Sequence, residues 1–285
     1  WTPIGTNFSK AFTGTFDGQD HSIRGLYINA SDSNYQGLFG YMSGTNSAVR
    51  NLTVSGTVSV IGNSYVGGVV GYNNGGTIEN CHNTATVSES GSDTDIRIGG
   101  VVGWNDKGTV KNCSNTGKVS GNVFAGGVVG QNGGTVTNCH NNTGTVSGEG
   151  PAGGVVGQNG GTVENCSNAG EVSGSVDSTG GVVGYNFGGT VTNCYNTGEV
   201  SDDGYVGGVV GQNSGTVTNC YNTGEVSGGS SVGGVVGYNV VGTVENCYYE
   251  QGKAASGIGS PEASNTDAEP KTSTQFASGE VAWLL

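Results

Sequence analysis

A repeat of about 27 residues covers most of this chain, from residue 66 to residue 249. Its first half reads Gly-Gly-Val-Val-Gly-x-Asn, and its second half reads Thr-(Val/Ile)-x-Asn-Cys. The first half recurs at residues 67–73, 99–105, 126–132, 153–159, 180–186, 207–213 and 233–239. Self-similarity of this kind predicts a stack of coils, in which each unit buries its apolar face against its neighbours.

Composition decides what kind of coil this is. The chain has 58 Gly and 11% charged residues, but its Gly and Asn recur at fixed offsets around Val-Val pairs, which indicates ordered turns rather than disorder. Leu is almost absent, so the interior must consist of Val, Cys, Ile and Ala, which favour strands over helices. We expect an all-β, right-handed parallel β-helix with three short strands per coil. A leucine-rich repeat is excluded because its core positions require Leu, and a propeller is excluded because each blade needs a longer repeat.

Degenerate copies at residues 37–41, 48–52 and 21–28 extend the repeat toward the N-terminus. With them the stack has about nine coils, roughly 40 Å long at ~4.8 Å per coil. We therefore expect a β-helix over 1–250, with degenerate coils over 1–65. A polar irregular segment at 251–270 and a terminal cap or the start of a next region at 271–285 follow, and both ends look cut from a longer protein.

The spacing within a coil predicts a sharp bend. Ile78 and Cys81 are three residues apart, so both can point inward only if the chain bends at Glu79-Asn80. Asn tolerates the left-handed conformation that such a bend requires, and Gly25 fills the same slot in the first coil. The sequence thus predicts stacked Asn side chains at this corner: Asn80, Asn112, Asn138, Asn165, Asn193, Asn219 and Asn246. Asn73 and Asn83 mark two further corners where stacked amides can bond from coil to coil.

Charge excludes some partners. The net charge is −13, and no Lys or Arg occurs between Lys118 and Lys253. Such a surface repels phosphate backbones and anionic lipid, so we expect no nucleic acid partner. No apolar run is long enough to predict insertion of this region into a membrane.

The repeats resemble a known family. Gly37-Leu38-Phe39-Gly40, and the Gly-Val-Val-Gly that replaces it later, are similar to the GLUG motif. That motif occurs in repeat regions of bacterial surface and adhesin-like proteins, and in the non-catalytic part of some IgA-cleaving metallopeptidases. The stretch from Phe12 to Leu26 is similar to the one that often precedes such repeats. The resemblance covers residues 1 to about 250 and implies an extracellular or cell-surface location. The peptidase members carry a His-Glu-x-x-His zinc motif that this chain lacks, so no catalytic residue is implied.

Seven cysteines occupy one position per coil: Cys81, Cys113, Cys139, Cys166, Cys194, Cys220 and Cys247. Without a Cys-x-x-Cys or a His at ligand spacing, a zinc site is poorly supported. Stacked neighbours would lie about 5 Å apart, within reach of a disulfide. The odd count and the apolar setting favour a buried ladder of free thiols.

Tyrosines follow three successive cysteines at Tyr195, Tyr221 and Tyr248, and Tyr249 lies next to the last. Residues beside an inward Cys should face outward, so we expect an exposed tyrosine stripe. Such rings can stack on sugars or anchor a protein, and can equally stabilise the outside of the tube by stacking on one another.

Carboxylates gather at Asp177, Asp202 and Asp203 in neighbouring turns. They could hold Ca²⁺, although no calcium-loop motif is present, and solvated side chains are the simpler interpretation. The same residues are the candidates for a polysaccharide-active enzyme, an alternative that rests on fold analogy alone.

The sequence favours a non-catalytic module over an enzyme: a rigid spacer, an adhesin that binds a host glycan or extracellular protein, or both. No cofactor is expected apart from calcium. An ice-binding Thr array is a further alternative, but Glu79, Lys111, Glu164 and Glu245 interrupt its Thr-Val-Thr triplets.

Overall fold

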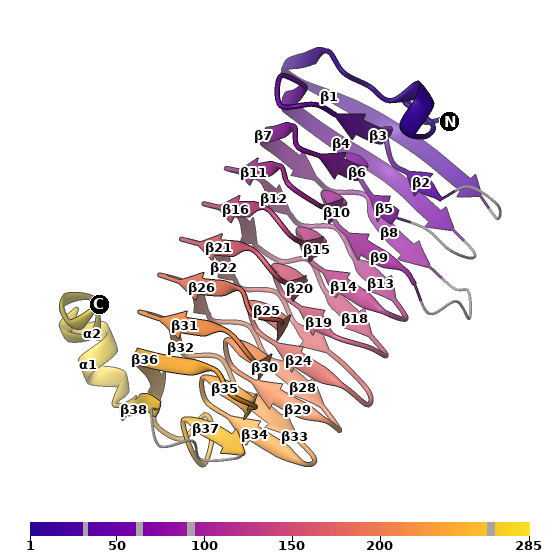
Figure 1. Cartoon of the computed structure of the whole chain (residues 1–285). Coiled ribbons are helices and arrows are strands. Elements are labelled where there is room, and N and C mark those ends of the chain that lie inside the picture. Colours follow the sequence, from indigo (N-terminus) through magenta and orange to yellow (C-terminus); the bar gives the residue numbers. More distant parts are fainter. Residues whose placement is uncertain (31–33, 61–64, 90–94, 261–265) are drawn as a thin grey trace.

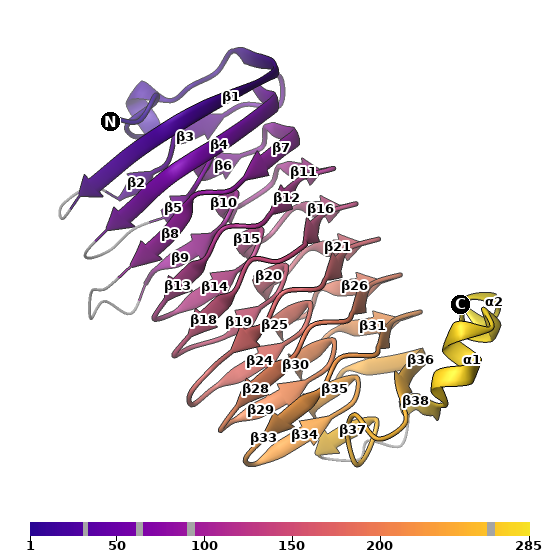
Figure 2. The same cartoon turned by 180° about the vertical axis from the view of Figure 1, so that it is seen from behind.

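The computed structural model describes residues 1–30, 34–60, 65–89, 95–260 and 266–285. Its strands pair in parallel from coil to coil and form a parallel β-solenoid (Figure 1). The view from behind shows the same stack, with the two termini at opposite ends (Figure 2). The predicted fold class is confirmed.

Three parallel sheets make the walls. Sheet A contains β3 (Phe39–Ser43), β6 (Val70–Asn74), β10 (Val102–Asn105), β15 (Val129–Asn132), β20 (Val156–Asn159), β25 (Val183–Asn186), β30 (Val210–Asn213), β35 (Val236–Asn239) and β37 (Ile258–Ser260). Sheet C contains β2 (Tyr35–Gln36), β5 (Tyr65–Gly67), β9 (Arg97–Gly99), β14 (Phe124–Gly126), β19 (Ala152–Gly153), β24 (Ser178–Gly180), β29 (Tyr205–Gly207) and β34 (Ser231–Gly233).

Sheet B holds the remaining strands. Those at its two ends are β1 (Thr15–Ala30), β4 (Ala48–Val60), β7 (Thr77–Asn83), β8 (Thr86–Glu89), β36 (Thr243–Glu250) and β38 (Thr266–Lys271). Between them lie β11 (Thr109–Lys111), β12 (Ser114–Asn115), β13 (Val119–Gly121), β16 (Thr135–Thr137), β17 (His140–Asn141), β18 (Val146–Gly148), β21 (Thr162–Glu164), β22 (Ser167–Asn168), β23 (Val172–Ser173), β26 (Thr190–Thr192), β27 (Tyr195–Asn196), β28 (Val200–Asp202), β31 (Thr216–Thr218), β32 (Tyr221–Asn222) and β33 (Val226–Gly228).

Each regular coil contributes to all three sheets, in agreement with the expected three-sided coil. In the coil over 97–121, β9 lies in sheet C, β10 in sheet A, and the short strands β11, β12 and β13 in sheet B. The chain turns between Gly99 and Val102, and again between Asn115 and Val119. A Gly-Gly or an Asn-x-Gly step thus divides the expected strands into shorter ones.

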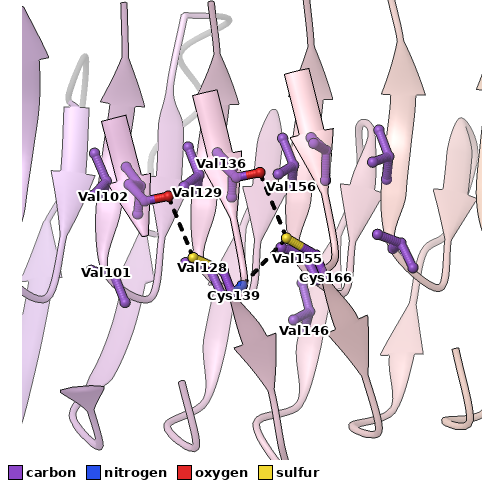
Figure 3. Packing of buried hydrophobic residues seen from close by; sticks show 14 of the residues in the cluster. Val101, Val102, Val128, Val129, Val136, Cys139, Val146, Val155, Val156 and Cys166 are labelled. Atoms are coloured by element: carbon purple, nitrogen blue, oxygen red, sulfur yellow. Dashed lines mark hydrogen bonds between the residues drawn. The ribbon is translucent and has the colours of Figure 1, made fainter. Parts of the chain in front are cut away.

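The interior is a continuous column of small apolar side chains. Val128, Val129, Val136 and Cys139 are fully buried, and their equivalents repeat in the neighbouring coils (Figure 3). Each buried Val contributes roughly 1.5 kcal/mol or more relative to an exposed one. Since every coil covers the apolar face of the next, the core exists only as a property of the stack.

The predicted bend is confirmed. Asn51 and the seven Asn residues expected at this corner have φ values between 51° and 54°, and Gly25 has φ 68°. Left-handed backbone costs most residues roughly 1–2 kcal/mol, and Asn bears it best among those with a side chain. The Asn80 side chain donates to Asn51 Oδ1 at 2.9 Å, and Asn246 donates to Asn219 Oδ1 at 2.8 Å.

Two further rows of Asn run inside the other corners. From Asn73 to Asn239, one amide per coil bonds the next at 2.8–3.0 Å, and a second row runs in the same way from Asn83 to Asn222. All these side chains are buried. We call these two rows the buried asparagine ladders. Each amide also bonds the backbone of its own turn, so that successive coils from the one with Asn73 to the one with Asn222 are tied together at two corners.

The C-terminal segment closes the last coil. Within the segment expected to be irregular, residues 251–270, β37 pairs with β35 and most of β38 pairs with β36. Two short helices follow, α1 (Ser273–Ala277) and α2 (Glu280–Leu284), and lie beside the final coils (Figures 1 and 2). Thr272 and Gln275 form a capping box at the start of α1. At the other end of the stack, the 3₁₀ helix η1 (Phe8–Lys10) precedes β1.

Candidate binding surfaces

The tyrosine stripe is shorter than expected. Tyr195 and Tyr221 stack with ring centroids 5.0 Å apart and planes at 3°, and Tyr195 is 36% exposed. Tyr248 and Tyr249 are only 6% and 5% exposed, so the expectation of exposed rings was wrong for both. Tyr248 is covered by β38, whose Glu269 pairs with it. Tyr249 points inward, because it occupies the slot that holds Asn222 in the preceding coil.

Other contacts complete this burial. The Lys271 ammonium lies 5.0 Å from the centre of the Tyr248 ring, and Phe276 of α1 lies 5.7 Å from the Tyr221 ring. Burial raises the pKa of Tyr221. An exposed platform on this face is therefore limited to Tyr195 and part of Tyr221.

The three aspartates lie together, but in different environments. Asp177 and Asp203 line one hollow of about 370 Å³, and Asp202 and Asp203 line an adjoining one of about 290 Å³. The Asp202 carboxylate is 5% exposed and accepts from the Thr179 hydroxyl at 2.6 Å and the Gly204 N–H at 2.8 Å. These two hydrogen bonds stabilise the turn that contains Asp202 and Gly204. No group of three or more metal-ligating side chains converges within the described residues.

All seven cysteines are buried free thiols. The Cys139 N–H donates to Cys166 Sγ at 3.4 Å, and the Cys166 thiol donates to the Val136 carbonyl at 3.7 Å (Figure 3). Burial raises the pKa of the Cys139 thiol well above its usual value. These groups fill the core and have no access to a substrate.

The Thr array is interrupted in the structure as in the sequence. Lys111 pairs in register with Thr137, which in turn pairs with Glu164, and Thr218 pairs with Glu245. Charged side chains thus break the row of hydroxyls along this part of sheet B.

A second surface was not anticipated. The variable position of Gly-Gly-Val-Val-Gly-x-Asn places one large side chain per coil along sheet A, and all pair in register. We call this set the corner row: Tyr41, Tyr72, Trp104, Gln131, Gln158, Tyr185, Gln212 and Tyr238. Tyr41 is buried and the others are partly exposed. The sequence contains the indication for this surface, because only aromatic and amide side chains fill this slot.

The corner row lies where sheets C and A meet. Tyr35 of sheet C lies 5.0 Å from the Tyr41 ring, and Tyr205 stacks on Tyr238 at 4.6 Å. The step between the sheets is tight: a Cβ on Gly103 would lie 2.5 Å from the Val66 backbone N. Glycine in this position lets sheet A approach sheet C until their partly exposed side chains touch.

Near the N-terminus the corner row is a packed aromatic cluster. The Arg97 guanidinium lies 5.1 Å from the Trp104 ring centre and 5.3 Å from that of Tyr65, and its Nε donates to Gln131 Oε1 at 2.7 Å. Burial, followed by the nearby Asp106 carboxylate, raises the pKa of Tyr72, whose hydroxyl donates to Asp106 at 3.3 Å.

Comparison with known proteins identifies the repeat. The GLUG motif matches residues 62–88, 94–120, 151–173, 177–201 and 202–227. The chain contains GLUG repeats. Within the described part of the chain these matches follow the coils, so the motif is a unit of the solenoid.

Two relatives contain a similar stretch. The chain is 46% identical over 54 residues to a protein of Evansella cellulosilytica named "Putative Gly-rich membrane protein", which is 19% of this chain and 6% of that protein. It is 36% identical over 86 residues to halomucin of Haloquadratum walsbyi, which is 30% of this chain and 1% of that protein. The chain thus spans a small part of the length of these relatives. Both names are consistent with a surface repeat module.

A solved structure shares the fold. The crystal structure of "a putative immunoglobulin A1 protease" from Bacteroides ovatus matches 99% of this chain and 76% of its own, with a TM-score of 0.53 and 21% identity. At this identity the likeness concerns the fold. Among the helices of the described part of the chain, none is long and apolar enough to cross a membrane.

Proposed function

We propose that this GLUG-repeat solenoid is a non-catalytic module of a secreted or cell-surface bacterial protein, where it serves as a rigid spacer that also binds an extracellular glycan or protein. The observation that carries the spacer role is the pair of buried asparagine ladders. They join successive coils by side-chain bonds in addition to the strand pairing, over the span from Asn73 to Asn239. A rod fastened in this way transmits force along its axis without a hinge.

Rigidity is tested by small-angle X-ray scattering. A spacer gives a maximum dimension and cross-section that stay constant from low to high salt. A scattering curve that requires several bent conformers would contradict the spacer role.

Adhesion is supported by exposed aromatic rings on an otherwise polar surface, because such rings are favoured anchors for sugars and proteins. The test is binding to an array of glycans and extracellular matrix proteins, run with calcium and with a chelator. Selective binding that is weakened by Tyr221→Ala would assign the contact to the Tyr195–Tyr221 stack, and loss in chelator would implicate Asp177 and Asp203. A blank array would refute adhesion and leave the spacer role.

A polysaccharide-active enzyme is the alternative that one observation favours, since Asp177 and Asp203 line the same hollow. Two carboxylates that flank a sugar bond are the minimum for glycoside hydrolysis. Release of reducing ends from a polysaccharide panel, abolished by Asp203→Asn, would establish this activity and overturn the non-catalytic proposal.

A further inference from the structure

We propose that the corner row binds a neutral, linear polysaccharide along the solenoid axis, with its central subsite at Tyr185. This inference rests on the proposed adhesive function and names both a different surface and a ligand class.

The central subsite is an aromatic platform. The Tyr185 ring is partly exposed, and Phe187, which is 62% exposed, lies 5.6 Å from it with the planes at 61°. Unlike the rings near the N-terminus, this pair is not enclosed by other aromatic side chains among the described residues. Exposed rings of this kind stack against the C–H faces of sugars.

Amide donors flank the platform on both sides. Gln158 in the preceding coil and Gln212 in the following coil both pair in register with Tyr185. A chain of side-chain hydrogen bonds leads to Gln158. Arg97 Nε donates to Gln131 Oε1, and Gln131 Nε2 donates to Gln158 Oε1, each at 2.7 Å.

This chain of hydrogen bonds ends at Gln158, whose Nε2 has no acceptor among the described residues. The Ser178 hydroxyl, which donates to Asp177 Oδ1 at 2.7 Å, lies 3.5 Å from Gln212 Oε1, and Gln212 Nε2 likewise has no described acceptor. Two amide N–H₂ groups are thus available beside one ring, which suits the hydroxyl oxygens of a sugar.

Geometry and charge select the ligand. Coils repeat at about 4.8 Å, close to the length of one sugar ring, so successive units of an extended chain can meet successive side chains of the corner row. From Gln131 to Tyr238 the corner row contains amides and aromatics and no charged side chain. A net charge of −13 on the whole chain disfavours anionic polysaccharides, which leaves neutral ones.

The test is affinity electrophoresis with soluble neutral polysaccharides, namely a β-glucan, a xylan and a mannan, with heparin as the anionic control. We expect retardation by at least one neutral polymer and none by heparin. Tyr185→Ala should weaken the retardation tenfold or more, Gln158→Ala should weaken it severalfold, and Tyr185→Phe should retain it.

The matched control is Tyr27→Ala, which removes a ring that is 62% exposed from β1 of sheet B and should leave this binding unchanged. Circular dichroism and thermal unfolding confirm that each variant is folded. Binding that Tyr221→Ala abolishes and Tyr185→Ala leaves intact would overturn the corner-row site while the proposed adhesive function survived. No retardation by any neutral polymer would also overturn it, whether or not the array detects a protein partner.

Discussion

Asn168 lies in one of the buried asparagine ladders, and its replacement by Ala measures how much a single ladder amide contributes. Its Nδ2 donates to Asn196 Oδ1 at 2.8 Å and to the Gly170 carbonyl at 2.7 Å. Its Oδ1 accepts from Asn141 Nδ2 at 2.8 Å and from the Gly170 N–H at 3.2 Å. All four bonds are buried, so these groups are shielded from bulk water in the native protein.

The four losses are not equal. Asn141 still donates to the Gly144 carbonyl and Asn196 still accepts from the Gly198 N–H, so each loses one bond of two. The Gly170 N–H loses the side-chain acceptor that satisfied it. A buried group left without a partner costs about 1–3 kcal/mol, and each other lost bond costs about 0.5–1.5 kcal/mol. We expect Asn168→Ala to reduce the free energy of unfolding by about 2.5–7.5 kcal/mol.

The assay is urea unfolding followed by circular dichroism and by tryptophan fluorescence. The matched control is Gln158→Ala, which removes an amide from a partly exposed row and should cost less than about 1 kcal/mol. Hydrogen exchange at the Gly170 amide should accelerate in the Asn168 variant. A cost below about 1 kcal/mol with an unchanged m-value would refute the idea that these amides hold the coils together.

Three further predictions concern other parts of the solenoid. Asn165→Gly should leave stability within about 0.5 kcal/mol, because glycine adopts its φ of 53° freely, whereas Asn165→Val should cost about 2 kcal/mol or more; thermal unfolding distinguishes them. In the native protein no thiol, Cys139 included, should react with a thiol-specific reagent, while all 7 should react in denaturant, and rapid native labelling would show that the core opens. Burial raises the pKa of Tyr72 above its usual value near 10, so the folded state keeps a proton that the unfolded chain loses; stability should fall as pH rises above about 10. Tyr72→Phe should reduce that fall, and equal alkaline unfolding of both proteins would argue against it.

The sequence predicted the repeat unit and its bend because both depend on local rules. The interval between Ile78 and Cys81 requires a change of direction, and Asn80 is the residue between them that best adopts a positive φ. The position of Asn73 indicated the buried asparagine ladder in the same way, since a short amide at a fixed offset in every coil has its nearest equivalent in the next coil.

The errors arose where distant segments meet. Tyr248 follows the rule for outward residues, but β38 pairs beside it, and residues 266–271 carry no repeat pattern from which that pairing could be deduced. The corner row was missed for a related reason. Whether Tyr185 has polar neighbours on both sides depends on the register of the coils, which brings Gln158 and Gln212 beside it.

The buried asparagine ladders also have a direction. In both, the Nδ2 of one coil donates to the Oδ1 of the coil that follows, and at Asn168 and several other positions a glycine N–H of the same turn also donates to that oxygen. The amide dipoles are thus aligned head to tail, and each orientation depends on the one before it. The second ladder ends where its slot holds Val54 at one end and Tyr249 at the other. Beyond those two coils the row of hydrogen-bonded amides stops, so the solenoid should bend or unfold first at its ends. A coil that lacked its ladder Asn would create a flexible point at that position in the stack.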